Sequence, residues 1–229
     1  MPAAPSRAIV NPAFAIADDF LTHREHLGLW EALQGALASP AGTQDWNRTF
    51  QLMDGEDLAT SRARQAVLRD GTPGTSPGPP ALRLFGEKLS ALMTGDRAPL
   101  PVAPWTGFSA SAWIYRAGSG LEWHGDTGRL AAYIYYIHPA WRSSWGGELL
   151  VAAQEDGSSG APSAPGDSRH AVEAVCTTGG AFIYPRPNRL VLLRGGVLHC
   201  VKKVESAAGA AFRASVSGFF FDTGSGNAV

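Results

Sequence analysis

The residues most suited to chemistry are a histidine and an aspartate two positions apart, His124 and Asp126, in the run Trp-His-Gly-Asp. Side chains alternate faces along an extended chain, so these two point to the same side and offer one nitrogen and one oxygen ligand. His199 lies in a second apolar run with strand character, residues 197–201, and can add another nitrogen. Two histidines and one carboxylate form the facial triad that holds Fe(II) with coordination positions left open. The sequence therefore predicts that His124, Asp126 and His199 are metal ligands at a catalytic centre.

The specificity of this signal comes from a combination of features. A His-x-Asp match alone is weak, because short motifs arise by chance and a lone histidine is more often structural. Here the distant histidine is followed by Arg213 and Ser215, which share one face of the apolar run 212–221. Cys200, directly after His199, is expected to face away from the metal.

Three stretches carry a resemblance to a known family. Residues 129–141, together with Gly146-Gly147-Glu148-Leu149, resemble the central block of prolyl-4-hydroxylase-like oxygenases, which depend on Fe(II) and 2-oxoglutarate. Residues 188–193 resemble the strand that leads to the distal histidine in the same family. The likeness extends from about Ser109 to Phe221, and it implies the double-stranded β-helix fold that the family shares.

The resemblance also implies how a cosubstrate is held. In similar enzymes 2-oxoglutarate and O2 take the open iron positions, and the far carboxylate of 2-oxoglutarate needs a buried cation. Arg213 suits this role because a guanidinium matches a carboxylate in bidentate geometry, and Ser215 can add a hydroxyl. Tyr136 and Tyr115 match positions that contact the cosubstrate in some prolyl hydroxylases.

Two alternatives stay open for the counterion and the outcome. Lys202 and Lys203 are rival counterions, because the segment between His199 and Arg213 is longer than in the most similar prolyl hydroxylases. Asp126 favours hydroxylation, since halogenating relatives replace this carboxylate with a small residue, whereas desaturation and ring formation remain open.

The prime substrate is expected to be a small molecule, namely a free amino acid or a natural-product intermediate. A prolyl residue of a protein or peptide is the alternative, and a non-catalytic sensor of metal and 2-oxoglutarate is a third. Arg142 and Arg186 are candidate clamps for a substrate carboxylate. Five tryptophans flank the metal motif and either pack between sheets or line the substrate site: Trp105, Trp113, Trp123, Trp141 and Trp145.

Composition narrows the class of protein. The 229 residues, 45% hydrophobic, suit a single oxygenase domain over residues 1–229. A net charge of −1 gives no electrostatic case for nucleic acid or an anionic membrane. Two cysteines, no segment with the length of a membrane span and no signal peptide predict a cytoplasmic protein. The oligomeric state is not determined by these features.

The region 1–100 is expected to be a helical support for the core. A short strand at residues 8–10 precedes a capping box, Thr22 with Glu25, that opens a helix. The helix has a stripe of Leu27, Trp30, Leu33 and Leu37 expected to pack against a sheet, and His23 and His26 are expected on its surface. Residues 44–53 are a possible edge strand, and 81–93 form a second amphipathic helix. The Pro/Gly-rich loop 71–80 between them is either a lid or a plain surface loop.

The region 105–221 contains short strands separated by glycine and proline turns. Strands are expected at 109–116, 132–137, 149–153, 182–184, 190–193, 197–201 and 212–221, with a flexible insertion at 156–168. This pattern predicts a mainly β fold with N-terminal helices, in which a jelly-roll or cupin-like double-stranded β-helix is backed by helices.

Overall fold

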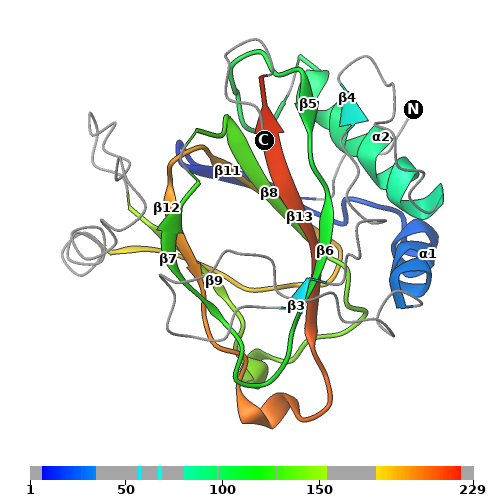
Figure 1. Ribbon diagram of the computed structural model, residues 1–229, viewed down its shortest axis with the longest axis vertical. Helices are drawn as coiled ribbons and strands as arrows, with labels where there is room; N and C mark the ends of the chain where they lie inside the picture. The colour runs from blue at the N-terminus through cyan, green and yellow to red at the C-terminus, as the bar shows by residue number, and fades with distance from the viewer. Residues whose placement is uncertain are drawn as a thin grey trace.

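Among the residues that the structure describes, two antiparallel sheets and two α-helices make up the fold (Figure 1). The computed structural model describes residues 7–34, 56–57, 67–68, 80–96, 98–126, 128–153 and 179–222. The expected edge strand 44–53, the loop 71–79 with its possible lid role, and the insertion 156–168 lie outside these residues.

The larger sheet has the strand order β1–β2–β11–β8–β13–β5–β4. Its members are β1 (Arg7–Val10), β2 (Phe14–Asp18), β11 (Arg189–Arg194), β8 (Ala131–Tyr136), β13 (Arg213–Phe221), β5 (Gly107–Phe108) and β4 (Val67–Leu68). Strand β6 (Ser111–Tyr115) also pairs with β13, and β3 (Glu56–Asp57) pairs with β6.

The smaller sheet has the order β10–β9–β12–β7. Its members are β10 (Gly180–Ile183), β9 (Leu149–Ala152), β12 (Leu198–Val201) and β7 (Leu121–Gly125). From β6 onward the chain passes repeatedly between the two sheets, with β6, β8, β11 and β13 in the larger and β7, β9, β10 and β12 in the smaller. This alternation is the jelly-roll arrangement, so the predicted double-stranded β-helix is confirmed.

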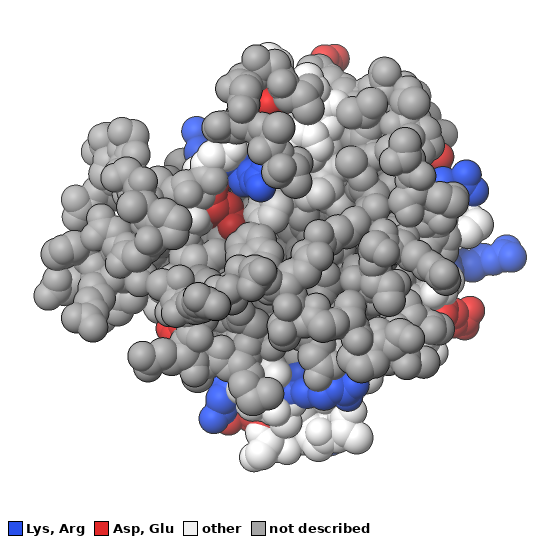
Figure 2. Space-filling model, viewed as in Figure 1, with Lys and Arg blue, Asp and Glu red and all other residues white. Residues whose placement is uncertain are grey.

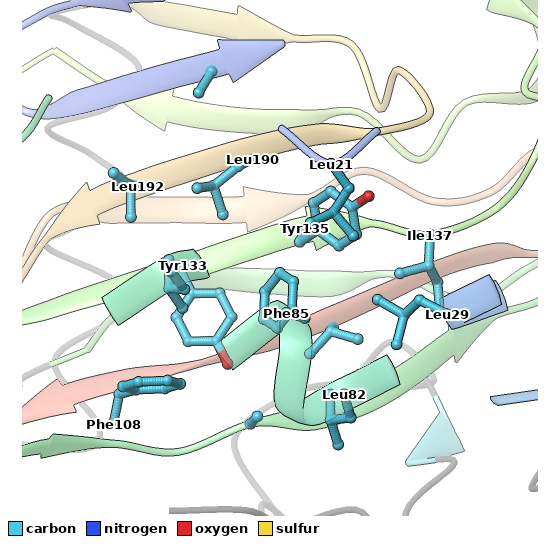
Figure 3. Packing of buried hydrophobic residues seen from close by; sticks show 14 of the residues in the cluster. Leu21, Leu29, Leu82, Phe85, Phe108, Tyr133, Tyr135, Ile137, Leu190 and Leu192 are labelled. Carbon is cyan, nitrogen blue, oxygen red and sulfur yellow. The ribbon is translucent and has the colours of Figure 1, made fainter. Parts of the chain in front are cut away.

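Helices α1 (His23–Gln34) and α2 (Pro80–Thr94) cover the outer face of the larger sheet (Figure 1). The predicted capping box opens α1, since the Thr22 amide donates to the Glu25 carboxylate at 2.8 Å and the Glu25 amide to the Thr22 hydroxyl at 3.4 Å. From α2, Phe85 packs on Tyr135, with ring centroids 5.1 Å apart, and on Tyr133 (Figure 3). Truncating such a buried aromatic costs about 3–5 kcal/mol, so this contact holds the helices on the sheet.

One expectation about α1 was wrong. His26, expected on the surface, is 4% exposed, and its Nδ1 lies 2.8 Å from the Tyr135 hydroxyl. That hydroxyl donates to the Asn188 side-chain oxygen at 2.8 Å, so Nδ1 carries the imidazole proton and donates it to Tyr135. Burial lowers the pKa of His26, which keeps the ring neutral. The buried face of α1 therefore contains His26, Leu29 and Leu33.

The larger sheet separates two apolar clusters. The outer cluster lies between this sheet and the helices and contains Ile114, Val216 and Phe220 (part of it is shown in Figure 3). The inner cluster lies between the two sheets and contains Tyr115, Tyr136 and residues of the smaller sheet such as Val151. Alternation along each strand thus places every second side chain of β6, β8 and β13 in the interior of the barrel.

Figure 2 shows the acidic and basic side chains of the described residues in small separate groups on one face. The net charge of the full sequence is −1. Among the described helices, none is both long enough and apolar enough to cross a membrane.

Candidate active site

The three predicted metal ligands converge on the smaller sheet. Strands β7 and β12 pair antiparallel with His124 directly opposite His199, and the two ring centroids are 4.2 Å apart. Asp126 follows the end of β7, and its carboxylate lies 3.5 Å from Nε2 of His199 and 4.0 Å from Nε2 of His124. One ligand atom from each residue lies within 4.8 Å of the other two, the spacing that a single metal ion requires.

Backbone carbonyls orient both imidazole rings. Nδ1 of His124 donates to the carbonyl of Glu122 at 2.7 Å, and Nδ1 of His199 donates to the carbonyl of Val197 at 2.8 Å. The proton is thereby held on Nδ1, and Nε2 presents its lone pair toward Asp126. This is the tautomer that metal ligation needs, with the outer hydrogen bond fixing the ring.

Electrostatics also suits a metal. Burial, with the neighbouring imidazole of His199, lowers the pKa of His124 to about 4, although the Asp126 carboxylate opposes this shift. His124 is therefore neutral at physiological pH, as a metal ligand must be. Two imidazoles and a carboxylate form the donor set expected for Fe(II) with open positions, so these residues fit that ion.

Arg213 is buried in the interior as a cation. It is 1% exposed, and its guanidinium lies over the rings of Tyr136 and Tyr115, at 4.8 and 4.9 Å from their centroids. Its terminal nitrogen donates to the Tyr136 hydroxyl at 3.4 Å, and Nε has no hydrogen-bond partner. Within the described chain its side chain forms no ion pair with a carboxylate. A buried cation with unsatisfied donors is costly, so the arrangement suits an anionic ligand.

The other predicted cosubstrate residues surround this arginine. Strand register places Tyr115 opposite Arg213 across β6 and β13, and Ser215 opposite Tyr136 across β13 and β8. Cross-strand partners point to the same side of a sheet, so all four side chains face the interior. The rival cations Lys202 and Lys203 are exposed, which favours Arg213 as the interior cation.

Gly147 has no side chain and so leaves room for the side chain of Arg213. A Cβ built on Gly147 would lie 2.9 Å from Cδ of Arg213 and 3.2 Å from a methyl of Val204. The residue also has φ of 73°, a conformation that L side chains rarely adopt. The second glycine of the Gly-Gly-Glu-Leu run is therefore needed both for its backbone and for the adjacent guanidinium.

His138 was not singled out from the sequence, although it contacts this region. Its Nε2 donates to the Pro185 carbonyl at 2.8 Å, and its Nδ1 accepts from the amide of Ala214, next to Arg213, at 3.2 Å. Burial, together with the charge of Arg213, lowers the pKa of His138 to about 4, against a smaller opposing effect of Pro185. No local motif marks such a residue, because its partners Pro185 and Ala214 lie far from it in the sequence.

The remaining candidates do not all reach the interior. Arg186 pairs with Asp18 at 2.9 Å and with Asp19 at 3.1 Å, so the suggestion that it clamps a substrate is not supported. Arg142 lies over the ring of Trp145, 5.4 Å from its centroid. Four of the tryptophans pack in the apolar clusters or against them: Trp105 in the outer one, Trp141 in the inner one, and Trp113 and Trp145 against the latter. Trp123 is half-buried.

Comparison with known proteins agrees with this geometry. A family model of the 2OG-Fe(II) oxygenase superfamily matches residues 110–221, the segment that contains the triad and Arg213. The matched segment, just under half of the chain, belongs to this superfamily. The expected relationship to prolyl-4-hydroxylase-like oxygenases is thereby confirmed, and the protein is a 2-oxoglutarate-dependent dioxygenase of a family that uses Fe(II), 2-oxoglutarate and O2.

Solved structures resemble the whole oxygenase. A prolyl-4-hydroxylase from Pseudomonas putida shares 16% identity at a TM-score of 0.61, over 93% of this chain and 94% of that one. A prolyl hydroxylase from Trichoplax adhaerens, in complex with a hypoxia-inducible-factor peptide, shares 18% identity at a TM-score of 0.63, over 96% and 89%. An alpha-ketoglutarate-dependent epimerase from nogalamycin biosynthesis shares 13% identity at 0.51, over 92% and 79%. At these identities the likeness shows the fold alone. No curated protein matches the sequence.

Proposed function

We propose that this oxygenase hydroxylates an unactivated C–H bond of a small molecule, with His124, Asp126 and His199 as the iron ligands. The observation that carries the proposal is the convergence of these three ligand atoms within 4.8 Å, on rings that their backbone partners orient for ligation. When bound in such a site, Fe(II) supplies activation of O2 coupled to oxidative cleavage of 2-oxoglutarate into succinate and CO2.

The chain's own residues then have separate tasks. Arg213 binds the far carboxylate of 2-oxoglutarate, and Tyr136 and Ser215 add hydroxyl groups on the same inner face. Tyr115 supports the guanidinium from the other side through its ring. The inner apolar cluster excludes water around this end of the site, which strengthens the charge pairing.

The substrate is proposed to be a small molecule, namely an amino acid or a natural-product intermediate. The alpha-ketoglutarate-dependent epimerase, and a carbocyclase that also comes from nogalamycin biosynthesis, share this fold at TM-scores of 0.51 and 0.55. Inner-face positions of β6 and β13 include the half-buried side chains of Trp113 and Ser217, which leave surface that a small ligand could contact.

Hydroxylation of a prolyl residue in a peptide is the second candidate. It is favoured by the prolyl hydroxylases among the similar structures, one of which is bound to a peptide. The two candidates differ in the compound that stimulates turnover of 2-oxoglutarate.

The experiment is to measure succinate formation with Fe(II) and O2, alone and with free amino acids, carrier-bound amino acids or proline-containing peptides. We expect slow basal formation, stimulation by a small molecule and a product heavier by one oxygen atom. Stimulation by peptides alone would shift the assignment to prolyl hydroxylation. If iron and 2-oxoglutarate bind but no succinate forms under any condition, the protein is a sensor and the proposal is wrong.

A further inference from the structure

The inner faces of β13 and β6 are less buried at one end of the barrel, which we call the open end. On β13 the inward-facing residues change from the buried Arg213 and Ser215 to the half-buried Ser217 and Phe219. The inner face of its neighbour β6 changes in the same direction, from the buried Tyr115, opposite Arg213, to residues that are half-buried. This end, where Phe219 lies, is the one at which we expect a prime substrate to enter.

A second arginine lies at this open end. The guanidinium of Arg129 lies over the ring of Phe219, 5.3 Å from its centroid. The Arg129 amide donates to the carbonyl of the proposed iron ligand Asp126 at 3.4 Å, and the next residue, Leu130, donates to the carbonyl of Phe220 at 3.0 Å. The backbone thus holds Arg129 between the carboxylate ligand and the end of β13.

Arg129 has an aromatic platform, the ring of Phe219, but no anionic partner among the described residues. Within residues 98–126, 128–153 and 179–222, no carboxylate forms an ion pair with it, whereas Arg186 and Arg189 both pair with Asp18. Stacking on an aromatic ring occupies only the flat face of a guanidinium, so its N–H edge remains available for hydrogen bonds. That edge matches a carboxylate in bidentate geometry.

Charge balance favours an anionic substrate. The positive charges of Fe(II) and Arg213 are offset by Asp126 and by the two carboxylates of 2-oxoglutarate. Among the described residues no carboxylate offsets the charge of Arg129, and this residue lies at the open end. An aromatic ring beside it, Phe219, offers an apolar surface to the rest of the same molecule.

We infer that Arg129, held on Phe219, binds a carboxylate of the prime substrate, which is therefore a small carboxylic acid with an apolar portion. This inference rests on the proposed function and specifies its substrate class. Arg129 acts as a specificity residue, separate from Arg213, which serves the cosubstrate.

The test measures binding without turnover. Protein loaded with Mn(II) and 2-oxoglutarate under anaerobic conditions is titrated calorimetrically with matched acids and amides: L-proline and L-prolinamide, L-leucine and L-leucinamide, 3-phenylpropionate and 3-phenylpropanamide. We expect at least one acid to bind at least about tenfold more tightly than its amide, the range for hydrogen bonds to charged groups. The amino-acid and plain-acid pairs distinguish the two sources of the carboxylate.

Variants localise the effect. Arg129→Gln should weaken binding of that acid by about tenfold or more and leave its amide unchanged, and Arg129→Lys should recover part of the affinity. Arg142→Gln is the matched control, because Arg142 also stacks on an aromatic ring, that of Trp145, and should leave both affinities unchanged. Circular dichroism and thermal unfolding verify that each variant is folded.

The inference is overturned if no acid binds more tightly than its amide, or if Arg129→Gln leaves the preference intact. The proposed function is judged separately, by basal succinate formation that depends on Fe(II) and O2 with no substrate added.

Discussion

Replacing Arg213 with methionine should separate ligand binding from stability. The side chain is fully buried, stacks on Tyr115 and Tyr136, and forms no ion pair with a described carboxylate. In the protein without 2-oxoglutarate, Arg213→Met removes two cation–π contacts of about 1–2 kcal/mol each and one long hydrogen bond of about 1 kcal/mol or less. It also removes a desolvation penalty of about several kcal/mol for a buried, unpaired cation. The free energy of unfolding should therefore change little.

Binding of 2-oxoglutarate should change far more. Removing one partner of a buried charged hydrogen bond costs about 2–5 kcal/mol. At about 1.4 kcal/mol per factor of ten, Arg213→Met should raise the KM for 2-oxoglutarate about 30-fold or more, with little change in affinity for the prime substrate. The stabilisation that saturating 2-oxoglutarate gives the wild type should be lost at the same concentration.

Steady-state succinate formation measures the KM, and thermal unfolding with and without 2-oxoglutarate measures both stabilities. Lys202→Ala and Lys203→Ala are the controls, since both lysines are exposed and should leave the KM unchanged. If Arg213→Met unfolds about 10 °C lower without ligand while the KM is unchanged, the arginine is part of a structural ion pair and our reasoning is wrong. A raised KM in a lysine variant alone would assign the counterion to that lysine.

The remaining predictions concern the metal, the glycine and a buried histidine. His199→Ala should lose bound iron in metal analysis while circular dichroism remains native; full iron content would exclude it as a ligand. Gly147→Ala should raise the KM for 2-oxoglutarate more than tenfold, because its Cβ meets Arg213, whereas Gly118→Ala, at φ of 92° with no atom within 4 Å, should cost stability and leave the KM unchanged. If both variants raise the KM equally, backbone strain is the cause. Burial lowers the pKa of His138 to about 4, against about 6.5 in the unfolded chain, so between these values only the unfolded state binds the proton. The free energy of unfolding should fall by about 2 kcal/mol between pH 6.5 and pH 5 through this group, and urea titrations of His138→Gln should lack that component.

Local sequence pattern was sufficient for most strands of the region 105–221 and for part of the candidate site. Period-2 alternation places Arg213 and Ser215 on one face of β13, whereas the register between β6 and β13 was needed to add Tyr115 to that face. The capping box of α1 was equally local, since Thr22 and Glu25 supply both hydrogen bonds themselves. In each of these cases the information lies within a few consecutive residues.

Features that depend on distant partners could not be read in this way. His26 looked like a surface residue because its partner, Tyr135, lies 109 positions further along the chain. Arg186 looked available for substrate until the fold placed Asp18 and Asp19 beside it, 167 positions away in the case of Asp19. A side chain's role follows from its partners, and the register of distant strands determines them.

The division of the site between the sheets explains why the inner cluster matters for catalysis. The candidate iron ligands are on β7 and at its end, and on β12 in the smaller sheet, while the cation for 2-oxoglutarate is on β13 in the larger. One molecule of 2-oxoglutarate must span both, so the separation of the sheets must match its length. That separation is set by side chains packed between them, including Leu149, Val191 and Val201. Protein interiors are close-packed, so even a change of one methylene group in this cluster is felt by its neighbours. Such a change would therefore alter the distance between metal and arginine as well as stability, although it touches neither residue.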